Sequence, residues 1–273
     1  NTHTDISVDV GVSTEILMAK TDIKAKFGFK GSWESEGSTN KSRLILLNKA
    51  DLADERVTLE WSKYFEDKGI KVIKLDSRSK NGMKAVNAAI LEACKEKIER
   101  DRKRGIINRP VRAMVAGIPN VGKSTFINSF AGKSCAKTGN KPGVTKGKQW
   151  IRLNKSLELL DTPGILWPKF EDPQVGLMLA FTGAVKEDVL DVEDLAARLM
   201  LLLWQRYPDK VKERYGIDCE PDAPAWELLE AAGRKRGYLM ARGEINLERM
   251  AKVLLDEYRG GKLGKFTLEI PEE

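Results

Sequence analysis

The chain has 273 residues, of which 41% are hydrophobic and 32% charged, a composition typical of a globular protein rather than a disordered one. Its longest apolar run, residues 199–204, is far shorter than the roughly 20 residues that cross a bilayer. One histidine argues against histidine-based triads and metal sites, and three widely spaced cysteines predict neither a disulfide framework nor a zinc site. We therefore expect a cytoplasmic protein without a membrane partner.

The net charge of +7 is concentrated in the first part of the chain. Residues 1–172 hold 32 Lys and Arg against 21 Asp and Glu, whereas residues 173–273 hold 15 against 19. Two stretches, 95–112 and 133–155, are strongly basic. Such stretches favour a polyanionic partner, because basic side chains bind phosphates; a solvated protein face is the alternative.

Apolar periodicity predicts strands that alternate with helices, followed by helices alone. We predict strands at 6–12, 44–47, 70–75 and 112–116, a hairpin at 149–153 and 157–160, and helices at 55–68, 83–104 and from Lys123. Further helices are predicted at 175–185, 192–206, 225–236 and 246–258. The alternation is typical of a mostly parallel α/β sheet, so we expect an α/β domain over 1–172 and an all-helical domain over 173–273.

Residues 117–124, G-I-P-N-V-G-K-S, match the phosphate-binding pattern G-x-x-x-x-G-K-[ST] between a predicted strand and a predicted helix. The glycines let backbone N–H groups surround phosphates, and the helix N-terminus adds positive charge. Lys123 would reach the β- and γ-phosphates, and Ser124 would ligate Mg²⁺. Asp161, in D-T-P-G, would act on the same Mg²⁺, and the N–H of Gly164 would contact the γ-phosphate.

The motif N-K-A-D at residues 48–51 follows a strand, where ligands bind in open α/β sheets. The Asp51 carboxylate can accept hydrogen bonds from both N1–H and the 2-amino group of guanine, a donor pair that adenine lacks. Asn48 would contact the N7 side of the purine, and Lys49 would pack along the ring. We expect Asp76-Ser77 to reach the guanine oxygen through the backbone.

These motifs occur in an unusual order, because N-K-A-D precedes the phosphate loop. In the common small-GTPase arrangement the phosphate loop comes first. The order predicts a circularly permuted domain, a change that compact domains with neighbouring termini tolerate. The segment after Gly164 then leads into the helical domain, so nucleotide state would pass along one short tether.

The chain resembles the circularly permuted ribosome-assembly GTPases of the YlqF/RbgA type in L-I-L-L-N-K-A-D, G-I-P-N-V-G-K-S-T, A-K-T-G-N-K-P-G-V-T, L-L-D-T-P-G-I-L-W-P-K-F-E-D and K-E-R-Y-G-I-D. The resemblance extends from about residue 44 to the C-terminus, and residues 1–43 match poorly. It implies a circularly permuted Ras-like P-loop GTPase domain that binds GTP and Mg²⁺. The GTP contacts it implies are Asn48, Lys49, Ala50, Asp51, Asp76, Ser77, Asn120, Val121, Gly122, Lys123, Ser124, Thr125 and Gly164. The implied Mg²⁺ contacts are Ser124, Thr145 and Asp161, and Asn120 is also implied in holding K⁺.

The position after the D-x-x-G glycine holds a water-orienting glutamine in Ras-like enzymes, but Ile165 stands here. We therefore expect slow intrinsic hydrolysis that a ribosomal particle stimulates, as the resemblance implies. The family's W-F-P-G-H segment, with its proposed catalytic histidine, has no counterpart in residues 1–43, and His3 does not match it. The catalytic residue is left unassigned, and Lys123 and Gly164 are expected to support the transition state.

The resemblance also implies that the helical domain contacts rRNA. The local candidates are Arg234, Lys235, Arg236 and Arg242 near Tyr238, because basic and aromatic side chains together bind phosphates and stack on bases. The alternative is a basic helix end that complements the helix dipole.

We expect a monomeric GTPase that binds the maturing large ribosomal subunit through its rRNA. GTP binding and hydrolysis would drive a late assembly step and the protein's own release. The alternative is an rRNA-binding scaffold whose nucleotide site senses GTP with little turnover. A GTPase that acts on membranes is disfavoured, because the sequence has no lipid-binding helix.

Overall fold

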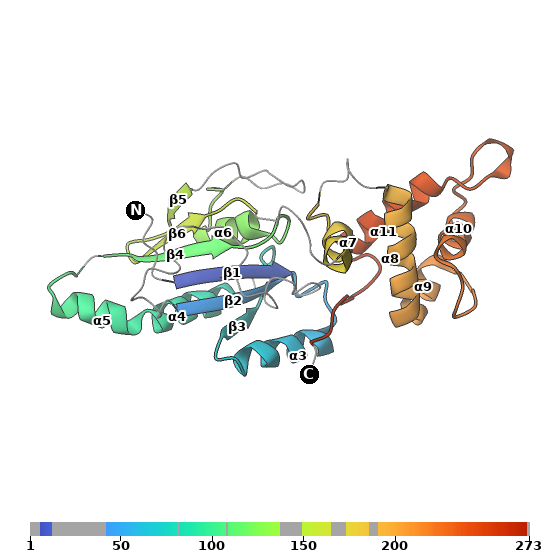
Figure 1. Ribbon diagram of the computed structural model, residues 1–273. Coiled ribbons are helices and arrows are strands. Elements are labelled where there is room, and N and C mark those ends of the chain that lie inside the picture. The colour runs from blue at the N-terminus through green and yellow to red at the C-terminus, as the bar shows by residue number, and fades with distance from the viewer. Residues whose placement is uncertain are drawn as a thin grey trace. The chain divides into compact units, whose positions relative to one another are not determined.

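The computed structural model describes residues 6–12, 42–80, 82–107, 109–136, 149–164, 173–185 and 191–271, and residues 6–12 are described as backbone alone. The chain forms two compact units (Figure 1). Unit 1 comprises Asn1–Glu171 and Phe266–Glu273, and unit 2 comprises Asp172–Lys265. The final residues therefore belong to unit 1, which corrects the helical domain expected over 173–273. No helix in the described ranges is both long and apolar enough to cross a membrane.

A six-stranded sheet in the order β3-β2-β1-β4-β6-β5 forms the centre of unit 1 in the described part of the chain. β5 is antiparallel to β6, and the other neighbouring pairs are parallel. The ends of β2 and β4 therefore lie along the same edge of the sheet. The strands are β1 (Ile6–Val12), β2 (Ser42–Asn48), β3 (Lys71–Lys74), β4 (Val111–Ala116), β5 (Gln149–Arg152) and β6 (Leu157–Asp161).

One hydrophobic cluster of unit 1 forms where helix α3 (Glu55–Glu66) packs on the sheet. β2 is apolar and buried from Leu44 to Leu47, as is typical of a strand inside a parallel sheet whose faces are covered. Trp61 and Phe65 of α3 pack against β2 and are fully buried, which stabilises the fold by about 2–3 kcal/mol for each side chain. Asp54 caps α3 by accepting hydrogen bonds from the backbone N–H groups of Arg56 and Val57.

Two helices, α4 (Met83–Ala93) and α5 (Lys95–Lys103), replace the single helix that the sequence predicts over 83–104. The break lies at Cys94, whose φ of −102° and ψ of 8° are not helical. α4 buries three side chains, whereas α5 buries none. Figure 1 shows α4 alongside the sheet and α5 continuing past it at the edge of unit 1. The apolar pattern that predicts helix therefore ends with α4.

Residues 266–269 are anchored to α3 and to the turn that precedes it. The N–H of Phe266 donates to the carbonyl of Leu52 at 3.0 Å, and the N–H of Asp54 donates to Thr267 Oγ1 at 3.1 Å. Trp61 Nε1 donates to the carbonyl of Glu269 at 3.1 Å. Because Phe266 is 2% exposed, its ring adds to the core of unit 1.

Unit 2 is helical and is organised around α8 (Val192–Arg206), which packs against the other helices. Met200, Leu203 and Trp204 of α8 are buried and Leu201 is half-buried. Helix α9 (Pro208–Tyr215) is not predicted from the sequence, and Pro208 occupies its first turn. The remaining helices are α7 (Pro173–Phe181), α10 (Ala225–Lys235), α11 (Leu247–Arg259) and the 3₁₀ turn η2 (Ala241–Gly243).

Candidate nucleotide site

The loop between β4 and α6 (Lys123–Ala131) has a backbone that few residues adopt easily. Asn120 has a φ of 62° and Gly122 a φ of 92°, both in the left-handed region. A Cβ atom on Gly122 would lie 2.5 Å from Asn48 Nδ2, so the loop needs glycine there for space as well as for conformation. The loop curls directly before the N-terminus of α6, the arrangement that binds phosphates.

Asn48 joins three segments that are far apart in the sequence. Its Nδ2 donates to the carbonyl of Val121 at 2.8 Å. Its Oδ1 accepts from the backbone N–H of Ser77 at 3.1 Å and from Ser77 Oγ at 2.8 Å. Asn48 is 1% exposed, so these contacts satisfy a fully buried amide. They confirm the predicted meeting of the N-K-A-D turn and the phosphate loop.

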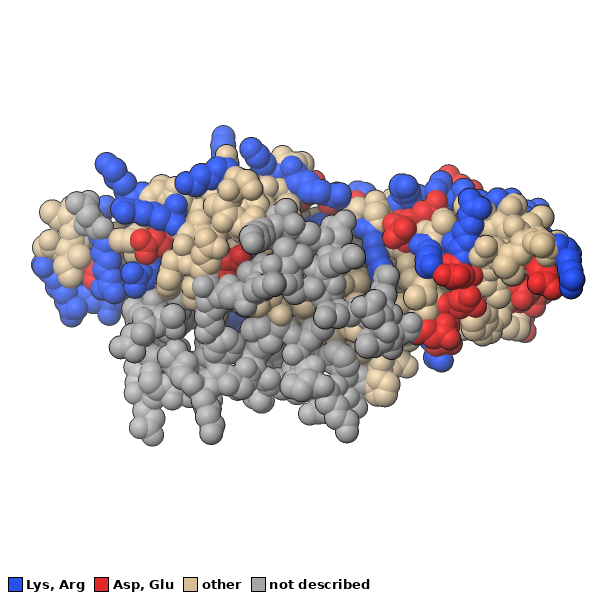
Figure 2. Space-filling view, turned by 90° about the horizontal axis from the view of Figure 1, so that it is seen from above, with Lys and Arg blue, Asp and Glu red and all other residues tan. Residues whose placement is uncertain are grey.

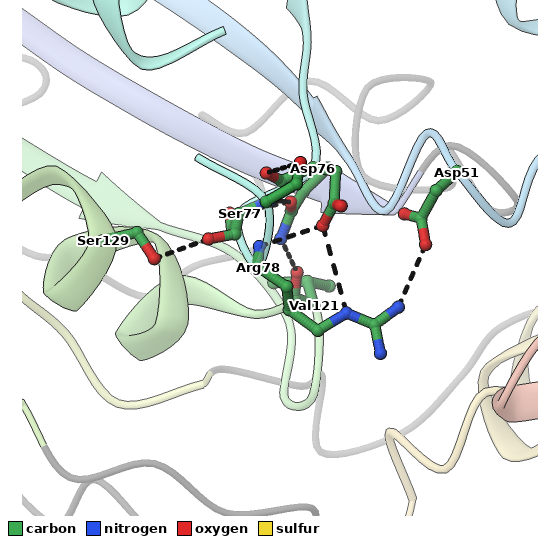
Figure 3. A network of polar contacts seen from close by, with 8 residues as sticks. Asp51, Asp76, Ser77, Arg78, Val121 and Ser129 are labelled. Atoms are coloured by element: carbon green, nitrogen blue, oxygen red, sulfur yellow. Dashed lines mark hydrogen bonds and ion pairs between the residues drawn. The ribbon is translucent and has the colours of Figure 1, made fainter. Parts of the chain in front are cut away.

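The segment after β3 presents the carboxylate of Asp76 and the guanidinium of Arg78 beside that turn (Figure 3). Arg78 extends between Asp51 and Asp76, with 3.0 Å from its Nη2 to Asp51 Oδ2 and 3.9 Å from its Nε to Asp76 Oδ1. Asp76 Oδ1 also accepts from the backbone N–H of Arg78, and although burial acts to raise the pKa of Asp76, these contacts hold it below its usual value. The structure thus brings together the predicted base-reading residues Asp51, Asp76 and Ser77.

Lys123 is the buried cation of the site. It is 6% exposed, and its Nζ donates to the carbonyls of Gly117 at 2.9 Å and Ile118 at 2.8 Å. Burial lowers the pKa of Lys123 to about 8, and the charge of Asp161 partly opposes that shift. Lys123 is thus held inside the loop with its ammonium close to where the motif expects phosphate oxygens.

Asp161, at the end of β6, is 1% exposed. Burial raises its pKa, while Lys123 and the backbone N–H of Thr162 act in the opposite direction. Its Oδ1 has no hydrogen-bond partner among the described residues. A buried, unpartnered carboxylate oxygen beside a phosphate loop fits a Mg²⁺ site, because Mg²⁺ takes one or two protein oxygens together with phosphates and water. No group of three or more His, Cys, Asp or Glu side chains that could hold a metal occurs in the described ranges, and Ser124, at the start of α6, is the other described residue that the sequence assigns to Mg²⁺.

Gly164 lies against the phosphate loop. A Cβ atom placed on it would be 2.7 Å from both Cα and N of Pro119, closer than side chains approach backbone. Thr162, two residues earlier, holds this segment to β4 through a hydrogen bond from Oγ1 to the carbonyl of Val115 at 2.7 Å. The segment 161–164 is therefore in contact with the loop, as its predicted role in reading the γ-phosphate requires.

The other predicted residues lie either in the same turn and loop or outside the described ranges. Lys49 has a φ of 55°, Ala50 donates its N–H to the carbonyl of Leu75 at 3.2 Å, and Ser124 and Thr125 are half-buried at the start of α6. Thr145, Ile165 and His3 lie outside the described residues.

The predicted RNA-contacting residues of unit 2 divide into two kinds. Arg234, Lys235 and Arg242 are exposed. Arg236 instead lies 3.6 Å from Glu257 Oε2 and 5.3 Å from the ring of Tyr215. Glu257 also binds Arg214 and Tyr215, and although burial acts to raise its pKa, these partners lower it. Arg236 therefore serves the packing of unit 2, which weakens its assignment to RNA.

Two contacts of the site were not predicted from the sequence. Arg78 directly follows the predicted pair Asp76-Ser77, and this position is the only signal in the sequence that could have identified it. Ser129 Oγ of α6 donates to the carbonyl of Ser77 at 2.5 Å and fixes the base-side segment to the phosphate-side helix. A lone serine in a helix carries no such signal.

The strand order, the phosphate loop and the preceding N-K-A-D turn define a circularly permuted P-loop GTPase. Residues 112–214 match the model of a family described as 50S ribosome-binding GTPase. Ribosome biogenesis GTPase A of Bacillus cereus is 45% identical over 259 residues, covering 95% of this chain and 87% of that protein. The protein of that name from Thermotoga maritima is 31% identical over 235 residues, covering 86% of this chain and 79% of that protein. The chain therefore belongs to the ribosome biogenesis GTPase A family, and it is a GTP hydrolase.

The fold is also that of solved relatives. GNP-bound YlqF from T. maritima superposes with a TM-score of 0.60 at 25% identity, covering 98% of this chain and 94% of that one. A GDP-bound YlqF structure gives a TM-score of 0.63 at 24% identity, covering 98% of this chain and 96% of that one. These matches confirm the predicted α/β fold and its circular permutation.

Proposed function

We propose that this GTPase of ribosome assembly binds the maturing large subunit through rRNA. GTP binding and hydrolysis would drive a late assembly step and the protein's own release. The observation that carries the nucleotide site is the hydrogen bond from Asn48 to Val121, which holds the base-side turn and the phosphate-side loop together.

Guanine recognition follows from the carboxylate of Asp51. Its two oxygens can accept from guanine N1–H and the 2-amino group, whereas adenine would leave them unmatched. Arg78 occupies one side of Oδ2, and a carboxylate has further acceptor positions for the base. Asn48 and Lys49 border the purine, and Asp76-Ser77 approach the guanine oxygen.

Phosphate recognition follows from residues 120–125 and the N-terminus of α6. The loop N–H groups and the helix dipole attract the phosphates, and Lys123 moves its donors from the carbonyls of Gly117 and Ile118 to phosphate oxygens. Mg²⁺, held by Ser124, Thr145 and Asp161, would neutralise charge on the β- and γ-phosphates. Gly164 donates its N–H to the γ-phosphate, so segment 161–164 distinguishes GTP from GDP.

Hydrolysis is slow without a partner, because Ile165 cannot orient the attacking water as a glutamine does. Lys123 and Gly164 stabilise the charge that develops on the transferring phosphoryl group. Asn120, with its left-handed backbone, is the candidate ligand of K⁺. Equal turnover in sodium and potassium buffers would remove that assignment.

The proposed RNA contact on unit 2 uses Arg234, Lys235 and Arg242, which are exposed around the end of α10. Tyr238 lies between them, and Arg249 stacks over its ring at 4.4 Å. Arginine and an aromatic ring at one place suit phosphate contact combined with base stacking. We expect a monomer in the cytoplasm, where the ribosomal partner is available.

The test is single-turnover GTP hydrolysis with saturating large subunits, with small subunits as the matched control. We expect large subunits alone to accelerate hydrolysis, and a GTP analogue to hold the protein on them. No acceleration by large subunits would contradict the proposed enzyme. Stable binding without hydrolysis would instead favour the scaffold alternative, which the isoleucine at position 165 suggests.

A further inference from the structure

Helix α5 contributes nothing to the hydrophobic core. None of its residues is buried, whereas α4, which precedes it, buries Val86, Ala89 and Ile90. A polar helix of nine residues is marginal in water by itself, so α5 persists as a continuation of α4. Because packing does not account for its sequence, the side chains of α5 act at the surface.

That surface carries positive charges without acidic partners. We define the α5 surface as the exposed side chains of Arg100, Arg102, Lys103 and Arg104, none of which forms an ion pair with another described residue. The nearby Asp101 is already shared between Lys97 and Arg109, at 4.0 Å from each. In Figure 2, Lys and Arg side chains gather at the left end of the view, where Figure 1 places α5.

Helix electrostatics explain only part of this pattern. Basic residues in the last turn complement the helix dipole, an effect of about 0.3–1 kcal/mol that fades within one turn. Four positive side chains within residues 100–104 exceed that need and repel one another, because Asp101 among them is paired with Lys97 and Arg109. An anionic partner would relieve the repulsion.

The composition of α5 selects among anionic partners. A helix that lies on a membrane needs a broad apolar face, but Ile98 is the only aliphatic residue within Lys95–Lys103. Unpaired RNA is usually bound by aromatic stacking, and α5 has no aromatic residue. Base-paired RNA is recognised largely through its backbone, which suits arginine and lysine without aromatic neighbours.

We propose that the α5 surface binds the phosphate backbone of double-helical RNA. Arg100 and Lys103 are spaced i and i+3 in α5 and Arg104 is its C-cap residue, so the three lie at the end of the helix and can contact neighbouring phosphates, while the exposed Glu96 and Glu99 lie in the preceding turn. The proposal rests on the proposed function for the identity of its partner and adds a contact in unit 1 that is separate from the candidate residues of unit 2.

The experiment measures binding of the full chain to a fluorescent RNA duplex of about 20 base pairs between about 50 and 200 mM KCl. The test variant carries Arg100→Gln, Lys103→Gln and Arg104→Gln. The matched control carries Lys63→Gln, Lys71→Gln and Lys74→Gln, which remove three exposed charges from α3 and β3. Both variants should bind GDP like the wild type, since none of these residues lies in the nucleotide site.

We expect the slope of log K against log salt to fall by about two to three in the test variant, because each lost phosphate contact lowers it by roughly 0.9. The control should keep the wild-type slope. An unchanged slope in the test variant, or an equal loss in the control, would overturn the proposal. So would wild-type binding to phosphatidylglycerol vesicles in place of the duplex. A failure of large subunits to stimulate hydrolysis would count against the proposed function and leave the duplex result standing.

Discussion

The side-chain amide of Asn48 donates a hydrogen bond to the carbonyl of Val121, 73 residues further along the chain. The same side chain accepts two hydrogen bonds from Ser77. One buried residue thus sets the distance between the base-reading turn and the phosphate loop, and the geometry of both halves of the site depends on it.

Asn48→Ala should weaken GDP binding and destabilise unit 1. It leaves the Val121 carbonyl and the Ser77 N–H buried without their partner, at a cost of about 1–3 kcal/mol for each group. Urea unfolding and GDP titration measure the two effects. Asn154→Ala is the control, because Asn154 Oδ1 accepts similar bonds from Ser156 in an exposed turn. Equal effects of the two changes would contradict the linking role of Asn48.

Asp51→Asn should relax the preference for guanine. An amide offers one acceptor and one donor in place of two acceptors, so it matches xanthine better than guanine. Competition between GTP and xanthosine triphosphate measures the change. If neither affinity moves, Asp51 does not read the base.

Arg78→Met should lower GDP affinity by up to about fivefold, because an exposed ion pair that orients Asp51 contributes about 0.2–1 kcal/mol. Methionine keeps part of the aliphatic stem and removes the donors. Arg56→Met is the matched control, since Arg56 is an exposed arginine paired with Glu60 on α3 at 3.5 Å. A tighter GDP complex in Arg78→Met would mean that Arg78 competes with the base for Asp51.

The affinity for GDP should fall as pH rises above about 8. Burial lowers the pKa of Lys123 to about 8, and bound phosphates would raise it, so binding takes up a proton between these two pKa values. In that pH window the affinity falls by up to about tenfold per pH unit. Below it Lys123 is protonated with or without GDP, so its titration does not change the affinity. Calorimetry in buffers of different ionisation enthalpy should give little proton uptake at pH 7 and close to one proton at pH 9. Lys123→Arg, which stays charged, should abolish the uptake, and wild-type binding at pH 9 without uptake would contradict the assignment.

Gly164→Ala should reduce GTP affinity more than GDP affinity. The added Cβ would lie 2.7 Å from backbone atoms of Pro119, so segment 161–164 must move away from the phosphate loop. The loss of the Gly164 N–H at the γ-phosphate affects GTP alone. Gly69→Ala is the control, because its Cβ would meet nothing within 4 Å and adds only backbone strain at a φ of +73°. Equal losses for GTP and GDP would exclude a γ-phosphate contact.

Patterns with a clear period predict the fold well. β1 occupies 6–12 and α8 occupies 192–206, both as predicted, because alternation and helical spacing each leave one face to bury. The apolar pattern does not predict features that depend on local backbone geometry. It does not reveal the break at Cys94, and it misses α9, a short polar helix that begins at a proline.

The contacts of the candidate site also include some that the sequence predicts and some that it does not. Its motifs predict which residues meet, because Asn48 and Lys123 each follow a strand, and β2 and β4 end at the same edge of the sheet with β1 between them. They do not predict the ion pair between Arg78 and Asp51, since an exposed arginine beside a motif has many possible partners. The role of Arg236 is missed for a related reason, because Glu257, its partner, is 21 residues away on another helix.

The return of Phe266 and its successors to unit 1 makes the helical unit an insertion. The sequence suggested a single tether after Gly164, but two peptide connections join the units. A protease that cuts one of them would leave the pieces joined by the other. Any rearrangement that starts at the nucleotide must therefore satisfy both connections at once, because unit 2 cannot rotate about a single connection.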